Sequence, residues 1–310
     1  MIWGYLVHLS FNMWSDRPVG YGAHPPALRK LEFDDDLWHE ILARLAGAGG
    51  NMVVIDLGDA VRYRSHPEIA IRGAWSVAKL KRQLAIARRL GLEPIPKLNF
   101  SACHDHWLGP YSRMVSTPAY YRACRDLIAE VCRIFGKPRF FHLGMDEETP
   151  QHQRGHQYVV VRQHGLWWHD FHFLRREVQR HGVRPWLWSD YIWHHAGEFR
   201  RQMPRSVLQS NWYYAASFSE KIRYVNAYLE LDRLKYDQVP AATAYVAEDW
   251  AVADSFPRTV RFCARRLGAK RLKGFLQTLW RPTTREWRKD HRMAIDQLHR
   301  GVEAWGRRRG

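Results

Sequence analysis

Short runs rich in β-branched, aliphatic and aromatic residues recur along the chain, and each is followed by a longer stretch whose apolar positions have helical spacing. Such alternation is typical of βα units that build a parallel sheet. The short runs predict eight strands, at 2–10, 51–58, 93–100, 139–146, 184–190, 206–213, 240–246 and 273–280.

The longer stretches predict helices at 35–48, 75–90, 118–135, 163–181, 195–202, 219–235, 256–267 and 284–306. Several stretches are followed by the glycine expected just past a helix, at Gly91, Gly136, Gly182 and Gly268. Thr117 before Pro118 is typical of a helix start. We therefore expect an α/β protein in which residues 1–310 form one (β/α)8 TIM barrel, without a linker or a second domain.

Composition narrows the class of protein. The 310 residues are 46% hydrophobic and 14% aromatic, which is ample for a core, and no apolar run approaches the roughly 18 residues that would suggest a membrane helix. The N-terminus has neither a basic leader nor a small-residue cleavage site, so a cytoplasmic location is expected. The four cysteines lack CxxC spacing, which favours reduced thiols over a zinc knuckle.

The formal net charge of +17 raises the question of a nucleic-acid partner. The basic residues are dispersed, however, over segments expected to be solvated helix faces and ends, namely 79–89, 175–184, 264–273 and 306–310. We therefore expect no nucleic-acid partner. An anionic sugar polymer stays open as a substrate.

Polar and aromatic residues gather at the predicted strand ends, where (β/α)8 barrels place their chemistry. Tryptophan and tyrosine beside carboxylates and amides suit a sugar, whose C–H faces stack on rings while its hydroxyls form hydrogen bonds. Trp188, Trp212 and Trp280 are the main stacking candidates, although any one of them could simply fill the core. The expected substrate-binding residues are Arg17, Asn99, His104, His106, His142, Trp188, Asp190, Asn211, Trp212, Tyr245, Glu248 and Trp280.

The fourth predicted strand ends in the segment FHLGMDEE, residues 141–148. Glycosidic cleavage needs one carboxylic acid to protonate the leaving oxygen and a second group to stabilise or attack the developing positive charge. Asp146 and Glu147 could supply both. The pattern His142, Gly144, Asp146, Glu147 resembles the His-x-Gly-x-Asp-Glu pattern of glycoside hydrolase family 20, the retaining β-N-acetylhexosaminidases, and the resemblance extends to 186–190, 210–212 and 276–280.

The resemblance implies an oligosaccharide substrate and a reaction that uses no cofactor. It makes Glu147 the general acid/base, and it makes Asp146 the residue that orients the substrate's 2-acetamido group, which itself acts as the nucleophile. Further sugar contacts would come from Tyr245, Trp212, Trp280 and Arg17. Met145 replaces the usual second glycine, and Ala247 interrupts the Tyr-x-Asp pattern on the seventh strand.

The two catalytic candidates raise a geometric question. Side chains alternate along a strand, so Asp146 and Glu147 would face opposite sides unless the strand has ended or bends near Gly144. The alternative is that the acidic triplet begins a helix. Glu148 fits that alternative best, and otherwise we expect it to support the other two. Residues 149–162 are expected to cover the site.

Three other functions stay open. A related glycosidase would use Asp190, Glu248 or Asp249 as an enzyme nucleophile. A metal-dependent hydrolase would use histidine ligands, and candidates for them are His104, His106, His142, His152 and His156. A carbohydrate-binding barrel without activity would keep only the aromatic pocket.

Overall fold

Eight parallel strands form the central sheet in the computed structural model, which describes residues 1–17, 26–245 and 251–306. The sheet order is β8-β7-β6-β5-β2-β1-β10-β9. Parallel bridges from Gln209 to Gln238 and from Trp212 to Ala241 join the two outer strands, so the sheet closes into a barrel. The strands are β1 Ile2–His8, β2 Met52–Asp56, β5 Glu93–Lys97, β6 Phe140–His142, β7 Arg184–Trp188, β8 Leu208–Ser210, β9 Ala241–Thr243 and β10 Gly274–Thr278.

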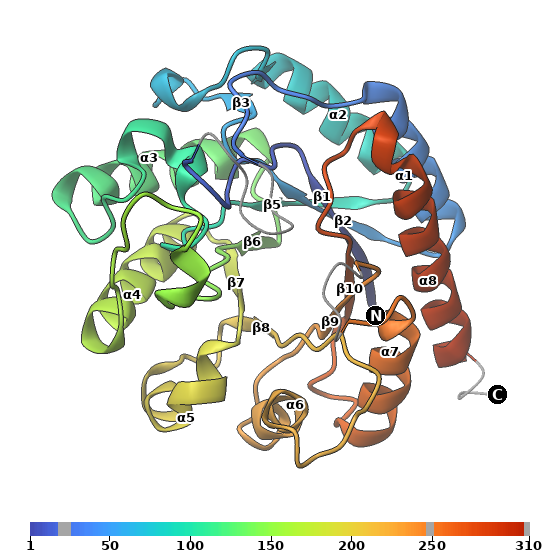
Figure 1. Ribbon diagram of the computed structural model, residues 1–310. Helices are drawn as coiled ribbons and strands as arrows, with labels where there is room; N and C mark the ends of the chain where they lie inside the picture. Colours follow the sequence, from blue (N-terminus) through green and yellow to red (C-terminus); the bar gives the residue numbers. More distant parts are fainter. Residues whose placement is uncertain (18–25, 246–250, 307–310) are drawn as a thin grey trace.

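The helices lie outside the strands around the barrel (Figure 1). They are α1 Asp35–Gly47, α2 Val77–Arg89, α3 Pro118–Ile134, α4 His164–Arg180, α5 Tyr191–Gln202, α6 Arg223–Arg233, α7 Ser255–Arg266 and α8 Arg288–Gly306. Short 3₁₀ segments cover Pro67–Ile69, His106–Tyr111, Gln151–Gln153 and Arg285–Trp287, and two-residue strands β3 Val61–Arg62 and β4 Trp75–Ser76 pair before α2. This arrangement confirms the predicted (β/α)8 barrel.

Local sequence explains several helix ends. The side chains of Asp34, Ser76 and Thr117 accept hydrogen bonds from backbone N–H groups in the first turns of α1, α2 and α3. Gly91, Gly136 and Gly182 adopt positive φ after α2, α3 and α4, as their position in the sequence predicted. Gly268 does not have a positive φ, because α7 ends at Arg266 and Leu267 is already extended.

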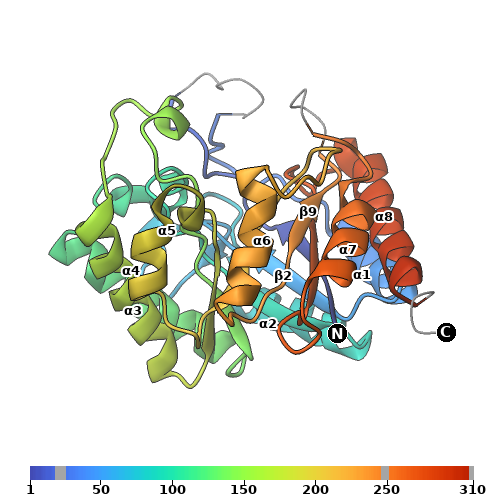
Figure 2. The ribbon, with the colours of Figure 1, turned by 90° about the horizontal axis from the view of Figure 1, so that it is seen from below.

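The hydrophobic core has two layers. One apolar cluster fills the barrel interior, and its bulkiest members are Phe140, Trp186 and Trp188. A larger cluster packs the outer face of the sheet against the helices. In the side view of Figure 2, the chain begins at one end of the barrel, and the loop after β6 projects from the opposite end. That opposite end is where the strands present their carboxyl ends.

Within the described ranges, no helix has the length and apolar character that a bilayer span requires. All four cysteines, Cys103, Cys124, Cys132 and Cys263, are buried and free, so no disulfide stabilises the barrel.

Candidate active site

The turn after β6 brings Asp146 and Glu147 to the same site. Regular strand geometry stops at His142, and positive φ angles follow at Gly144 (69°), Met145 (64°) and Glu147 (58°). The bend at Gly144 thus answers the question raised by the sequence. The alternative of an acidic helix start was wrong, because the next helical segment is the 3₁₀ turn Gln151–Gln153.

Asn99, which follows β5, holds this turn in place. Its Oδ1 accepts hydrogen bonds from the backbone N of Met145 and of Ser101, each at 3.1 Å, while its Nδ2 donates to Asp146 Oδ1 at 2.9 Å. A Cβ added to Gly144 would lie 2.0 Å from Asn99 Oδ1. The close approach of the amide therefore requires glycine at position 144.

His104 joins the two carboxylates. Its Nδ1 lies 3.3 Å from Asp146 Oδ1, and its Nε2 lies 3.3 Å from Glu147 Oε2. Burial alone would lower the pKa of His104, but the attraction of Asp146 and Glu147 and the hydrogen bonds to them outweigh burial and raise the pKa to about 10. The imidazole is therefore positively charged at neutral pH.

Asp146 is an ionised carboxylate in this environment. Burial would raise its pKa, but the charge of His104, its hydrogen bond, the charge of Lys97 and the Asn99 amide together hold the pKa of Asp146 well below its usual range. Lys97 lies one layer deeper, where it pairs with Asp56, and His8 Nδ1 lies 3.4 Å from Asp56 Oδ2. Lys97, Asp56 and His8 thus form a buried polar layer beneath Asp146.

Asp190 lies on the other side of Glu147. Its Oδ2 accepts a hydrogen bond from the backbone N of Glu147 at 2.9 Å, which fixes the turn from the β7 side. Burial, reinforced by the negative charge of Asp146, raises the pKa of Asp190 well above its ordinary value. The environment of Asp190 thus disfavours its ionised form, in contrast to that of Asp146.

Glu148 supports the turn from behind, as the sequence suggested. One of its oxygens accepts a hydrogen bond from the backbone N of Ala102 at 3.0 Å and pairs with the guanidinium of Arg162. Arg162 is fully buried and also pairs with Asp170 at 3.1 Å. These contacts tie the turn to α4 and to the loop after β5.

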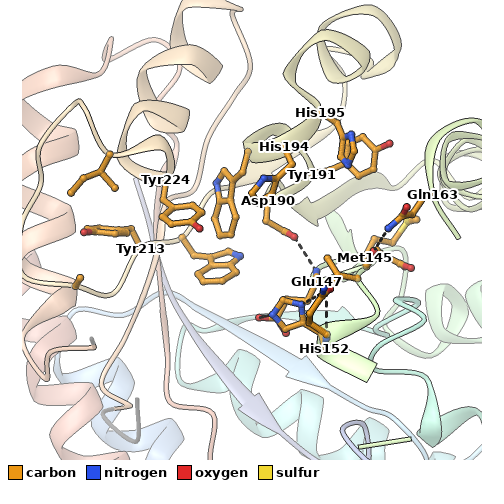
Figure 3. A pocket seen from close by; sticks show the side chains of 17 residues that line it. Met145, Glu147, His152, Gln163, Asp190, Tyr191, His194, His195, Tyr213 and Tyr224 are labelled. Atoms are coloured by element: carbon orange, nitrogen blue, oxygen red, sulfur yellow. Dashed lines mark hydrogen bonds and ion pairs between the residues drawn. The ribbon is translucent and has the colours of Figure 1, made fainter. Parts of the chain in front are cut away.

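Two cavities open at the carboxyl ends of the strands. The smaller, of about 270 Å³, is walled mainly by aromatic rings; it is lined by Trp14, Asp146, Glu147, His152, Trp188, Trp212, Tyr214, Tyr245, Ala251 and Trp280. The larger, of about 810 Å³, extends over β6, β7 and β8 toward α5 and is shown in Figure 3. Glu147, His152 and Trp212 line both cavities, so Glu147 lies at their junction.

The aromatic walls of the smaller cavity brace one another. The Trp212 and Tyr214 rings stack with centroids 5.2 Å apart, and Trp280 Nε1 donates a hydrogen bond to the Tyr214 hydroxyl at 3.3 Å. Trp280 also lies 5.9 Å from Trp188, ring centre to ring centre. Flat, apolar walls above an ionised carboxylate match the two kinds of surface that a pyranose presents.

Several predicted substrate-binding residues lie outside both cavities. Arg17 is exposed and donates hydrogen bonds to the backbone carbonyl of His156. Asn211 accepts a hydrogen bond from Trp193 Nε1 at 2.7 Å and donates to the backbone carbonyl of Tyr224 at 2.8 Å, so it positions two rings of the larger cavity. Both residues were predicted to bind the sugar, and neither lines a cavity.

His142 and His106 also differ from expectation. His142 is fully buried against Trp186 and Trp188, and its Nδ1 accepts a hydrogen bond from the Gly144 backbone N at 3.1 Å, so it supports the turn and lines neither cavity. His106 begins a 3₁₀ turn and lines neither cavity. Of the histidines named for the metal alternative, His104 and His152 approach the Glu147 carboxylate, at 3.3 and 3.7 Å. Glu248 and Asp249 lie outside the described residues.

Several residues that line the two cavities are not among those predicted from the sequence. Tyr214 follows Trp212 by two positions, and that spacing could have placed both rings on one side. Trp193 and Tyr224 belong to α5 and α6, and no strand-end rule points to them. Of the expected covering segment 149–162, Thr149, Gln151 and His152 do line the larger cavity.

The fold and site define a (β/α)8 barrel with paired carboxylates at its mouth. Neither a family model nor a curated protein matches the sequence. Among solved structures, the chain is similar to the GH20 exo β-N-acetylglucosaminidase from Vibrio harveyi in complex with N-acetylglucosamine, with a TM-score of 0.64 and 14% identity over 98% of this chain and 58% of that one.

Two further solved structures are similar to this chain. The β-N-acetylhexosaminidase from Bacteroides fragilis has a TM-score of 0.66 and 13% identity over 96% of this chain and 65% of that one. For dispersin B the TM-score is 0.56, with 13% identity over 86% of this chain and 94% of that one. The chain spans less than two thirds of the length of the Vibrio and Bacteroides proteins. The resemblance predicted from the sequence is thus confirmed for the barrel fold.

Proposed function

We propose that the protein is a glycoside hydrolase that cleaves β-linked sugars by the substrate-assisted route of β-N-acetylhexosaminidases. The observation that carries this proposal is the position of Glu147 at the junction of the two cavities, bridged through His104 to an ionised Asp146 in the smaller one. The smaller cavity would hold the sugar ring that is cleaved off. The larger would hold the leaving group.

In this reaction Glu147 enters in its protonated form and gives its proton to the glycosidic oxygen as the bond to the anomeric carbon breaks. The carboxylate that forms is stabilised by the adjacent His104 imidazolium, whose Nε2 faces it. The 2-acetamido oxygen of the substrate attacks the anomeric carbon and forms a cyclic intermediate. Glu147 then removes a proton from the water that opens this intermediate.

Asp146 would act on the acetamido group. As an ionised carboxylate within the small cavity, it can accept the acetamido N–H and stabilise the positive charge that spreads onto the nitrogen. One oxygen of Asp146 and one of Glu147 lie within 4.8 Å of each other. The two carboxylates are therefore close enough to act on neighbouring groups of one bound sugar.

The pKa of Asp190 favours the acetamido nucleophile over an enzyme nucleophile. Burial and the charge of Asp146 disfavour the ionised form of Asp190 that a nucleophile needs, and Asp190 Oδ2 already accepts a hydrogen bond from the Glu147 backbone. We expect Asp190→Asn to lower kcat modestly, because the asparagine Oδ1 can still accept from Glu147 N. A loss as large as that of Glu147→Gln would instead favour the glycosidase alternative with Asp190 as nucleophile.

The proposal is tested with aryl β-glycosides that carry or lack the 2-acetamido group. The wild-type protein should prefer the acetamido substrate and bind a thiazoline inhibitor tightly. Glu147→Gln should lower kcat by about 10²–10⁴-fold and leave inhibitor binding measurable. Equal turnover of the plain glycoside would remove the substrate-assisted route. Absence of turnover on every glycoside, with sugar binding retained, would identify a binding protein.

The metal-dependent alternative is tested in the same assay. His104, Asp146 and Glu147 offer three ligand atoms within 4.8 Å of one another, so a chelator is added before the substrate. Unchanged turnover in the chelator is the expected result. Loss of turnover that zinc restores would overturn the role of Glu147 as the acid.

A further inference from the structure

A second cluster of metal-ligand side chains lies at the outer end of the larger cavity, away from Asp146 and Glu147. His164 begins α4, and His195 and Glu198 lie on α5, one turn apart. His164 Nδ1 lies 2.8 Å from Glu198 Oε1, and one ligand atom from each of the three residues lies within 4.8 Å of the others. His195 itself lines the larger cavity, where Figure 3 shows it beside Tyr191.

We propose that His164, His195 and Glu198 bind a divalent transition-metal ion, such as Zn²⁺. Two imidazole nitrogens and one carboxylate oxygen form a donor set that zinc uses, with the remaining position open to water. The three ligand atoms lie within 4.8 Å of one another, which brings them near one position for an ion. The His164 side chain is 62% exposed and that of Glu198 is 24% exposed, so the ion would enter directly from solvent.

Aromatic residues already orient two of the three ligands. Glu198 Oε2 accepts hydrogen bonds from the Tyr191 hydroxyl at 2.8 Å and from Trp168 Nε1 at 3.1 Å, which turns its Oε1 toward His164. The His195 ring stacks on Tyr191 with centroids 4.5 Å apart. Such outer contacts restrict the ligands before the ion arrives, which is how metal sites gain affinity.

The backbone of His164 has an uncommon conformation. His164 adopts a φ of 50°, which is uncommon for a residue with a side chain, at the point where α4 begins. This conformation accompanies the contact of its imidazole with Glu198 on the neighbouring helix. A bound ion would link the start of α4 to α5 at the rim of the larger cavity. A ligand in that cavity with an anionic or carbonyl oxygen could then reach the open coordination position.

Zinc binding is measured by competition with a chromophoric chelator, and copper binding by electron paramagnetic resonance, on the intact chain without an affinity tag. The wild-type protein should bind one ion at this site with two coordinated nitrogens. His195→Ala and Glu198→Gln should each weaken zinc binding roughly tenfold or more, and Tyr191→Phe by a smaller factor. The copper spectrum of His195→Ala should retain one nitrogen.

The matched control is His194→Ala, which removes the neighbouring histidine whose Nδ1 contacts Arg223 at 2.8 Å instead of the cluster. It should bind zinc as the wild type does. Circular dichroism confirms that each variant is folded. Zinc binding that survives Glu198→Gln unchanged, or that is lost in Glu147→Gln instead, overturns the proposal. The effect of Glu147→Gln on glycoside turnover is independent of this result, because Glu147 is not a ligand of the proposed ion.

Discussion

The charged state of His104 predicts how the stability of the protein depends on pH. The folded protein raises the pKa of His104 from 6.5 to about 10, because Asp146 and Glu147 stabilise the imidazolium despite its burial. A group whose pKa is raised on folding contributes stability that is complete below its unfolded pKa and is lost as pH rises through its folded pKa. The contribution of His104 is therefore complete below about pH 6.5 and disappears toward about pH 10.

The size of this effect follows from proton linkage. Between about pH 6.5 and about pH 9 the unfolded chain releases nearly one proton that the folded protein keeps, at about 1.4 kcal/mol per pH unit. The contribution of His104 to the free energy of unfolding should thus fall by roughly 3 kcal/mol over this interval. Among the described histidines whose pKa is shifted, only that of His104 is raised. The histidines whose pKa is lowered on folding act in the opposite sense, so the contribution of His104 is read from the difference between the wild type and a His104 variant.

Urea denaturation at several pH values measures this slope. His104→Asn should be less stable than the wild type near neutral pH, and this difference in the free energy of unfolding should shrink by roughly 3 kcal/mol between about pH 6.5 and about pH 9. His169→Asn, which removes an exposed histidine on α4, should keep the wild-type slope. If His104→Asn declines as steeply as the wild type, then His104 is not the charged bridge between the carboxylates.

Three further substitutions test the construction of the site. Gly144→Ala should lower the free energy of unfolding by about 1–3 kcal/mol and remove much of the activity, because the new Cβ would collide with Asn99. Thermal denaturation measures the loss of stability, and kcat measures the loss of activity. Arg162→Met should lower the free energy of unfolding by about 3–5 kcal/mol, since it leaves the carboxylate of Glu148 buried without its partner; urea titration measures this. Trp280→Ala should raise KM roughly tenfold with a smaller change in kcat, because it removes a wall of the small cavity.

The order of strands and helices could be predicted because each element carries its own signal. The third helix was expected at 118–135 and covers Pro118–Ile134, since the Thr117 cap and the proline mark its start and Gly136 follows its end. The fifth helix begins at Tyr191 rather than at 195. Its first turn is rich in aromatic residues, whose helix propensity is low. The Tyr191 ring stacks on the Trp167 ring with centroids 4.2 Å apart, and this packing outweighs the low helix propensity.

The site could be predicted only in part. The sequence motif pointed to Asp146 and Glu147 as candidates. The residue types of Met145 and Glu147, however, do not predict the positive φ angles that these two residues adopt. They depend on Asn99, which is distant in sequence and captures the Met145 backbone N. The bridging position of His104 depends likewise on a contact between two strand-end loops. Neighbours in space, rather than neighbours in sequence, decide these conformations.

The closure of the barrel between β8 and β9 has a consequence for its dynamics. That seam rests on the bridges from Gln209 to Gln238 and from Trp212 to Ala241, whereas β1 and β2 pair over five consecutive positions. Amide protons along the seam should therefore exchange with deuterium sooner than those between β1 and β2. Because Trp212 also lines both cavities, transient opening of the seam would alter their width, and a sugar held against this ring would slow the exchange.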